Sequence, residues 1–200
     1  NKYREKNTAY SRLTKEMENI NAKLLKSEDK LDYTLRSLGS LKEDEIRARE
    51  QLDEIKVILK QTKSHINSYK LPVVPKNYYV ELDEANEAIR NMILELEEKP
   101  ISIKTLNTRV DTARDLVLKV YNTSLEIVKT ASMAENAIVY GNRYRFNNNI
   151  NNGLTKAEKE FFKGNFKSAL EYAINSINVV EPGIYNRLID AYKKEREAVK

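Results

Sequence analysis

The residues best suited to recognise another molecule lie in the stretch at positions 138–146. Two arginines and three aromatic residues fall within seven positions of it. On a helix, Tyr140 and Tyr144 share one face because they are four residues apart, and Asn142 and Arg145 share another. Arginine and tyrosine are enriched at the centres of protein interfaces. We therefore predict a protein-binding surface. The alternative is that the aromatic rings pack beneath the C-terminal helices while the arginines pair with carboxylates of the chain.

Residues suited to catalysis or metal binding are few. His65 is the only histidine, and we expect a solvated side chain on the outside of a helix, without the companions that a metal site needs. The carboxylates at 43–45 and 97–98 are expected to be solubilising charge on helix surfaces. The sequence has no cysteine and no glycine-rich phosphate loop. We expect a protein that is not an enzyme and that binds neither a metal nor a cofactor.

The composition favours helices over sheets. Of the 200 residues 32% are charged, with only five glycines and four prolines. The net charge of +5 is typical of a solvated helical surface, and since nucleic-acid binding would need a denser basic stripe, no nucleic-acid partner is expected. No apolar run approaches the length of a membrane span. The chain begins at Asn1 without an initiator methionine, which we interpret as a fragment of a longer protein.

One seven-residue frame runs without a slip through residues 13–69. Its a positions are Met17, Leu24, Leu31, Leu38, Glu45, Leu52, Leu59 and Ile66, and its d positions are Leu13, Ile20, Ser27, Thr34, Leu41, Ala48, Ile55, Thr62 and Tyr69. This pattern predicts one long helix in a left-handed supercoil, about 85 Å in length. Gly39 falls at an outward b position. Pro72 and Pro75 are expected to end the helix.

Two further helices are predicted at residues 77–99 and 102–146, separated by Pro100 and capped at Ser102. Each carries one apolar stripe, so the three helices should form an antiparallel bundle similar to a spectrin-like repeat. The second helix is much shorter than the first, which leaves the stripe at residues 13–45 uncovered. We expect either that the first helix is shared with a neighbouring bundle or that residues 13–45 form a homodimer.

The C-terminal part is predicted to form a short-helix cap. Residues 147–153 are rich in asparagine and are interpreted as a helix end and loop. Helices follow at 154–163, 166–180 and 184–198, with a turn at 164–165. The predicted fold class is all-α, with elongated antiparallel three-helix bundles, spectrin-like repeats that share long helices. One repeat would span residues 1–120, from helix 1–70 to the first half of helix 102–146, and a C-terminal repeat would span 121–200.

The C-terminal half contains four short motifs, which are Tyr140-Gly141-Asn142-Arg143-Tyr144-Arg145, Ala157-Glu158 with Phe161, Phe166 with Ala169-Leu170-Glu171, and Val180-Glu181-Pro182-Gly183. These motifs resemble the EzrA family of septation ring formation regulators from Gram-positive bacteria. The resemblance covers the chain in helix order and is specific over residues 138–185.

The resemblance implies a curved cytoplasmic rod, anchored by an N-terminal transmembrane helix that this fragment is expected to lack. It implies a place on the cytoplasmic face of the cell membrane at the division septum, where the family negatively modulates assembly of the FtsZ ring. The implied partners are FtsZ and other divisome or cell-wall synthesis proteins. The family's patch for mid-cell placement corresponds to Asn142, Arg143, Tyr144 and Arg145. We hypothesise that these residues engage an acidic or amphipathic segment of a division protein.

Two other functions fit the same residues. A curved helical module with a basic face would bind anionic membranes peripherally. A chain that dimerises through the stripe at 13–45 would be a generic coiled-coil scaffold. Salt-sensitive binding to vesicles would favour the first, and a dimer in sedimentation experiments would favour the second.

Overall fold

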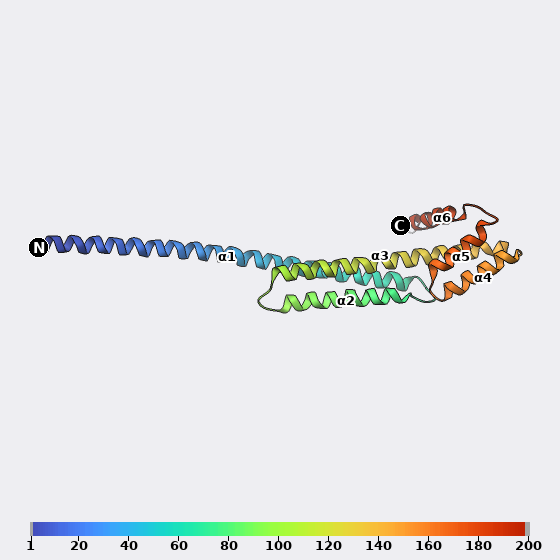
Figure 1. Ribbon diagram of the computed structural model, residues 1–200, viewed down its shortest axis with the longest axis horizontal. Helices are drawn as coiled ribbons and strands as arrows, with labels where there is room; N and C mark the ends of the chain where they lie inside the picture. Colours follow the sequence, from blue (N-terminus) through green and yellow to red (C-terminus); the bar gives the residue numbers. More distant parts are fainter. Residues whose placement is uncertain (1, 199–200) are drawn as a thin grey trace. The chain divides into compact units, whose positions relative to one another are not determined.

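The computed structural model describes the backbone of residues 2–198 and the side chains of residues 10–192. This part of the chain is helical and contains no strand, as predicted. Its α-helices are α1 (Lys2–Ser68), α2 (Lys76–Glu97), α3 (Ile103–Gly141), α4 (Asn148–Phe162), α5 (Phe166–Asn178) and α6 (Ile184–Ala198) (Figure 1). A single 3₁₀ turn, η1 (Asn142–Tyr144), follows α3. The chain divides into two units, one up to Arg49 and one from Glu50 onward.

The first unit consists of the N-terminal part of α1, and among its described side chains, those from Tyr10 onward, Ala48 is the only buried hydrophobic one. Its apolar heptad side chains are exposed, as expected for an uncovered stripe, and they are Leu13, Met17, Ile20, Leu24, Leu31, Leu38 and Leu41. The hydroxyls of Ser27 and Thr34, at d positions, donate to the carbonyls four residues earlier, at 2.9 Å and 2.8 Å. A β-carbon on Gly39 would meet nothing within 4 Å, which agrees with its outward position.

The second unit contains a core built from residues 50–68 of α1 together with α2 and α3, which lie side by side (Figure 1). The heptad frame correctly predicts the buried side of α1. The buried residues there are Leu52, Ile55, Leu59, Thr62 and Ile66. From α2 and α3 the core includes Tyr78, Ala85, Met92, Leu106, Val110, Val117 and Val120. Burial of each large side chain contributes about 1.5–3 kcal/mol, so these stripes hold the helices together.

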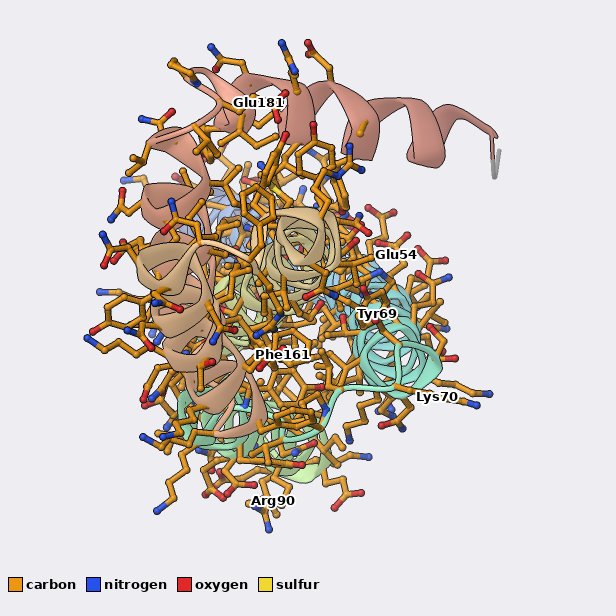
Figure 2. The ribbon with its side chains drawn as sticks, turned by 90° about the vertical axis from the view of Figure 1, so that its right-hand side faces the viewer. Glu54, Tyr69, Lys70, Arg90, Phe161 and Glu181 are labelled. Atoms are coloured by element: carbon orange, nitrogen blue, oxygen red, sulfur yellow. The ribbon has the colours of Figure 1, made fainter. Side chains whose placement is uncertain are left out.

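The predicted end of α1, both ends of α2 and the start of α3 are confirmed to within a few residues. Helix α1 ends at Ser68, before Pro72, and Pro75 precedes the first turn of α2. The Ser102 hydroxyl caps α3 by accepting a hydrogen bond from the Thr105 amide at 3.5 Å. Just after this C-terminal end of α1, the Tyr69 hydroxyl donates to Glu135 of α3 at 3.3 Å (Figure 2).

The prediction of a loop at residues 147–153 is wrong, because α4 begins at Asn148. Asn147 serves as its N-cap: its side chain accepts from the Asn149 amide at 3.0 Å and its carbonyl accepts from the Asn151 amide at 2.9 Å. Ile150 and Leu154 then lie four residues apart on one buried face. Burial of this face outweighs the local turn preference of asparagine, while Asn148 and Asn149, which precede Ile150, stay exposed.

Helix α3 ends as an α-helix at Gly141 and not at residue 146 as predicted. Gly141 is buried, and a β-carbon there would lie 2.8 Å from a Leu154 methyl and 3.0 Å from an Ile177 methyl. In the same cluster, a β-carbon on Gly153 would lie 1.8 Å from the Ser176 hydroxyl. These two glycines therefore allow α4 and α5 to approach each other and α3 closely.

The C-terminal helices pack on the end of α3 around one apolar cluster. It includes Ala134, Ile138, Ile150, Leu154, Ala157, Ala169, Ala173, Ile177, Ile184 and Leu188. Phe161 faces Phe166 across the turn between α4 and α5, with ring centroids 5.2 Å apart, as predicted. Helix α5 ends at Asn178, two residues before the predicted end. The division into spectrin-like repeats near residue 120 stays a prediction.

Replacing one buried and one exposed leucine tests this description of α1. Leu59 and Leu31 both occupy a positions, but the first is 6% exposed and the second 62%. We expect Leu59→Ala to lower the free energy of unfolding by about 2–5 kcal/mol, the usual cost of a cavity, and Leu31→Ala to change it by less than about 0.5 kcal/mol. Urea denaturation at low protein concentration measures both. Equal losses would mean that the stripe at 13–41 is covered in solution.

Candidate protein-binding site

All four predicted site residues lie on one turn between α3 and α4. Asn142, Arg143 and Tyr144 form η1, and Arg145 follows it. Asn142 and Arg143 are exposed, whereas Tyr144 and Arg145 are half-buried. The structure thus brings the four residues together but gives them different surroundings.

Tyr144 is held by Glu181, which lies in the turn between α5 and α6 (Figure 2). The hydroxyls of Tyr140 and Tyr144 both donate to Oε2 of Glu181, at 2.7 Å and 2.9 Å. Arg187 of α6 pairs with the other oxygen, Oε1. The two tyrosine rings lie next to each other, with centroids 6.3 Å apart. One carboxylate therefore joins the end of α3, η1 and the start of α6.

The ionisation of this cluster reflects its hydrogen bonds. The bonds from Tyr140 and Tyr144 stabilise the carboxylate form and lower the pKa of Glu181, and the charges of Arg187 and Arg143 act in the same direction. The hydrogen bond to Glu181 in turn raises the pKa of Tyr144, because the neutral hydroxyl is the donor. At neutral pH the cluster therefore holds an ionised glutamate that accepts a hydrogen bond from the neutral hydroxyl of Tyr144.

Arg145 has an internal role. Its Nε donates to Oδ1 of Asn142 at 2.8 Å, and Nη1 donates to Oδ1 of Asn151 at 3.0 Å. Its Nη2 pairs with Glu158 of α4. These bonds engage all three nitrogens of the guanidinium and fix η1 against the first three turns of α4, which leaves Arg145 little freedom to bind a partner.

Arg143 is the free cation of the four. Its Nε donates to the carbonyl of Tyr140 at 3.1 Å, and its Cζ lies 3.8 Å from the centroid of the Tyr140 ring, in a cation–π contact. Among the described side chains, no carboxylate forms an ion pair with it. The alternative interpretation therefore holds for the tyrosines and Arg145, which support the fold. Arg143 and Asn142 face solvent, and the protein-binding surface stays a prediction.

Sequence reasoning did not find the supporting residues Glu181, Arg187, Asn151 and Glu158. Glu158 and Glu181 lie in motifs that carry the family resemblance, but they are 13 and 37 residues along the chain from their partners in the predicted site, Arg145 and Tyr144, and this distance hides the contacts. No local period links such positions. The only available signal was the presence of glutamates inside otherwise apolar motifs.

The other candidates carry no catalytic arrangement. The expectation that His65 is solvated is wrong: it is half-buried, and its Nδ1 is shielded from water without a hydrogen-bond partner. His65 directly precedes Ile66, a buried a position, so its side chain borders the buried seam and packing covers part of it. In the part of the chain that the structure describes, no group of three or more histidine, aspartate or glutamate side chains could hold a metal ion.

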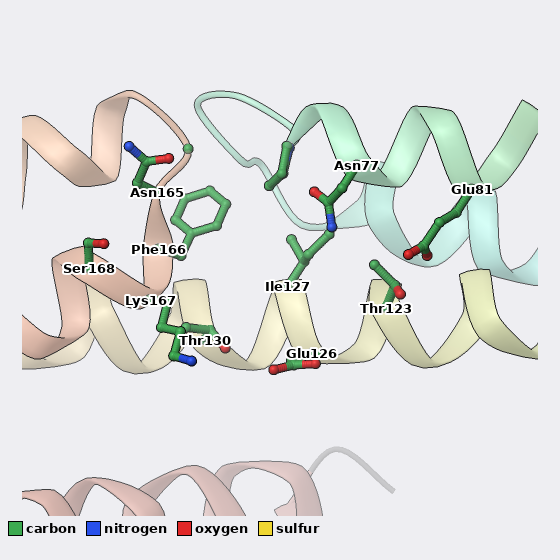
Figure 3. Close-up of a pocket in the computed structure, with 12 residues that line it drawn as sticks. Asn77, Glu81, Thr123, Glu126, Ile127, Thr130, Asn165, Phe166, Lys167 and Ser168 are labelled. Atoms are coloured by element: carbon green, nitrogen blue, oxygen red, sulfur yellow. The ribbon is translucent and has the colours of Figure 1, made fainter.

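A cleft of about 510 Å³ lies between the N-termini of α2 and α5 and the middle of α3 (Figure 3). Glu81, Thr123, Ile127 and Phe166 are among its lining residues. One carboxylate oxygen of Glu81 is buried without a hydrogen bond, and the other lies 3.8 Å from Nζ of Lys119. The lining contains no histidine that could activate a serine or threonine hydroxyl as a nucleophile, so we find no catalytic arrangement in this cleft.

Comparison with known proteins decides the family. The model of the family "Septation ring formation regulator, EzrA" matches residues 1–192. The chain belongs to the EzrA family. Relatives with this name include the EzrA of Geobacillus sp. (strain WCH70), 33% identical over 193 residues that make up 96% of this chain and 34% of the relative. The EzrA of Bacillus pumilus is 28% identical over 188 residues, 94% of this chain and 33% of the relative. That of Streptococcus pneumoniae (strain Hungary19A-6) is 26% identical over 197 residues, 96% and 34%.

The chain spans about a third of the length of these EzrA relatives. No solved structure matches it. Membership of the EzrA family connects the chain to cell division, which agrees with the resemblance found in its motifs. Within the described residues, no helix has the length and apolar character to cross a bilayer.

Replacing Glu181 tests its part in holding the C-terminal helix. In Glu181→Gln the charge is lost, so the hydrogen bonds from Tyr140 and Tyr144 and the pair with Arg187 weaken. We expect faster amide hydrogen exchange in α6 than in the unchanged protein, with exchange in α2 unaltered. Glu171→Gln is the matched control, because Glu171 is exposed on α5. Equal exchange in α6 of the two variants would contradict the role of Glu181.

The lowered pKa of Glu181 also predicts a dependence on pH. Its ionised form stabilises the folded state above the unfolded pKa, near 4.5, and this contribution is lost as the pH falls through the lower folded value. We expect the stability of the unchanged protein to fall more steeply below pH 4.5 than that of Glu181→Gln. Thermal unfolding between pH 3 and 6 measures this difference. Parallel curves for the two proteins would contradict it.

Proposed function

We propose that the protein is a non-enzymatic regulator of bacterial cell division that negatively modulates FtsZ ring assembly. It would act as a cytoplasmic rod, tethered to the membrane, and as a scaffold for other divisome and cell-wall synthesis proteins at the septum. The observation that carries this proposal is the match of the EzrA family model to residues 1–192. The tether would be the single N-terminal transmembrane helix that the resemblance implies.

The rod is supported by the unequal burial of one heptad stripe. Its a and d residues are buried from Leu52 to Ile66 and exposed from Leu13 to Leu41. Exposing an apolar stripe of this length to water has an unfavourable free energy, so we expect a second set of helices to cover it. We favour an arrangement in which spectrin-like bundles share long helices. A homodimer through residues 13–45 is the alternative occupant of the same stripe.

Recruitment would depend on the exposed part of the site. Tyr144 and Arg145 are engaged inside the fold by Glu181 and Glu158, so they would keep η1 in place. Arg143 and Asn142 would then make the contact with the partner. A guanidinium presented on an aromatic ring is rigid, and it loses little entropy when it pairs with a carboxylate. This division of roles explains why the predicted patch contains both buried and exposed polar residues.

Replacing Arg143 alone tests the site without disturbing its support. We expect Arg143→Ala to weaken binding of FtsZ about tenfold, or about 1.4 kcal/mol, and to reduce mid-cell enrichment of the protein in dividing cells. Co-sedimentation with FtsZ polymers and fluorescence microscopy measure the two effects. Arg109→Ala is the matched control, because Arg109 is also an exposed arginine of this part of the chain.

An unchanged thermal midpoint is expected for both arginine variants, since neither side chain is buried. If Arg143→Ala binds and localises like Arg109→Ala, the assignment of the site is wrong. Replacing Tyr144 or Arg145 is a poorer test, because loss of their internal hydrogen bonds would lower stability as well.

A further inference from the structure

Phe146 is the most exposed of the large hydrophobic side chains that the structure describes, at 85%. It lies between η1 and α4, one residue before the Asn147 cap. A phenylalanine in this setting loses the gain from burial that normally keeps it in a core. The described part of the chain leaves its ring in solvent, so its presence indicates a contact with another molecule.

The local fold does not use Phe146. The residue before a helix cap often packs against the fourth residue of the helix, in a hydrophobic staple. Here that fourth residue is Asn151, a polar side chain that accepts a hydrogen bond from Arg145. The cap itself is made by Asn147. Capping and the hold on α4 are thus complete without Phe146.

Three other exposed residues precede Phe146 at helical spacing. Val139 is 62% exposed, and Asn142 and Arg143 follow three and four residues later. Phe146 comes three residues after Arg143. We call Val139, Asn142, Arg143 and Phe146 the tip surface: they are exposed residues of the end of α3, η1 and the turn that follows it.

The tip surface contains one cation, Arg143, and no carboxylate. The sequence contains no acidic residue between Glu135 and Glu158. Glu158 is paired with Arg145, and Glu181 with Arg187. Arg143 is left without an ion-pair partner among the described carboxylates, so a partner that carries a carboxylate complements this surface.

We propose that the tip surface binds an acidic amphipathic peptide segment, with Phe146 as its apolar anchor and Arg143 as its carboxylate contact. This rests on the proposed function, because Asn142 and Arg143 belong to the same site. An exposed ion pair alone contributes little to affinity, whereas aromatic residues commonly dominate interfaces. Anionic bilayers attract clusters of four or more basic residues, and a single free arginine favours a peptide over a membrane.

Serine in place of Phe146 tests the anchor in dividing cells. We expect Phe146→Ser to reduce mid-cell enrichment by about fivefold or more, as Arg143→Ala does. Phe162→Ser is the matched control, since Phe162 is 67% exposed at the end of α4 and outside the tip surface, and it should leave enrichment unchanged. Thermal midpoints of both phenylalanine variants should equal that of the unchanged protein, which excludes misfolding.

The pattern across the variants separates the two proposals. Loss of enrichment in Arg143→Ala with none in Phe146→Ser would overturn the anchor and leave the site in place. No loss in either variant would overturn the site. An equal loss in Phe146→Ser and Phe162→Ser would also overturn the anchor, because it would reflect general exposure of aromatic residues.

The chemistry of the partner can be tested with a fluorescent reporter. The sequence contains no tryptophan, so Phe146→Trp in the 200-residue chain introduces a single indole. We would titrate this variant with an amphipathic helical peptide that has glutamate on its polar face, with the same peptide carrying lysine, and with vesicles of phosphatidylglycerol. We expect a saturable blue shift with the glutamate peptide, at least about tenfold stronger than with the lysine peptide. No response to it, an equal response to both peptides, or a response to vesicles alone would overturn the assigned partner class.

Discussion

The structure depends on one constraint: each helix has an apolar stripe on one side only, and that stripe must be covered. In the second unit α1 contributes Leu52, Ile55 and Leu59, and α2 and α3 supply the opposing side chains. Burial of these stripes outweighs the charge on the remaining surface, and it leaves polar faces outward. The same heptad continues at residues 13–41 without a cover, so the helix that builds one core also carries an unsatisfied surface.

The C-terminal cluster meets the constraint with small residues and one ionic link. Gly141 and Gly153 allow α3, α4 and α5 to come within contact of one another's side chains. Glu181 then joins Tyr140, Tyr144 and Arg187 through hydrogen bonds and charge. A half-buried carboxylate is tolerated here because donors satisfy both of its oxygens.

This arrangement separates side chains that support the fold from exposed side chains within four consecutive residues, Arg143 to Phe146. Tyr144 and Arg145 point their polar groups into the fold, whereas Arg143 and Phe146 are exposed. A binding surface benefits from such a base, because residues that are already ordered lose less entropy when the partner binds. The candidate site is therefore a short turn held by the hydrogen bonds of Tyr144 and Arg145. Its exposed side chains can be replaced without loss of those bonds.

The sequence by itself determined the helices and the sides on which they pack. The heptad frame identified the buried residues of α1, because it is a periodic pattern. Pro72, Pro75 and Ser102 marked helix ends, because proline and capping residues act locally. Tertiary structure alone decided that the asparagine-rich residues 147–153 are helical, since burial of Ile150 and Leu154 overrides their turn preference. It also decided which arginine is free. Arg143 and Arg145 are alike in sequence, and Asn151 and Glu158, which folding brings to Arg145, distinguish them. Ion pairs between distant positions follow from packing and leave no periodic trace in the chain.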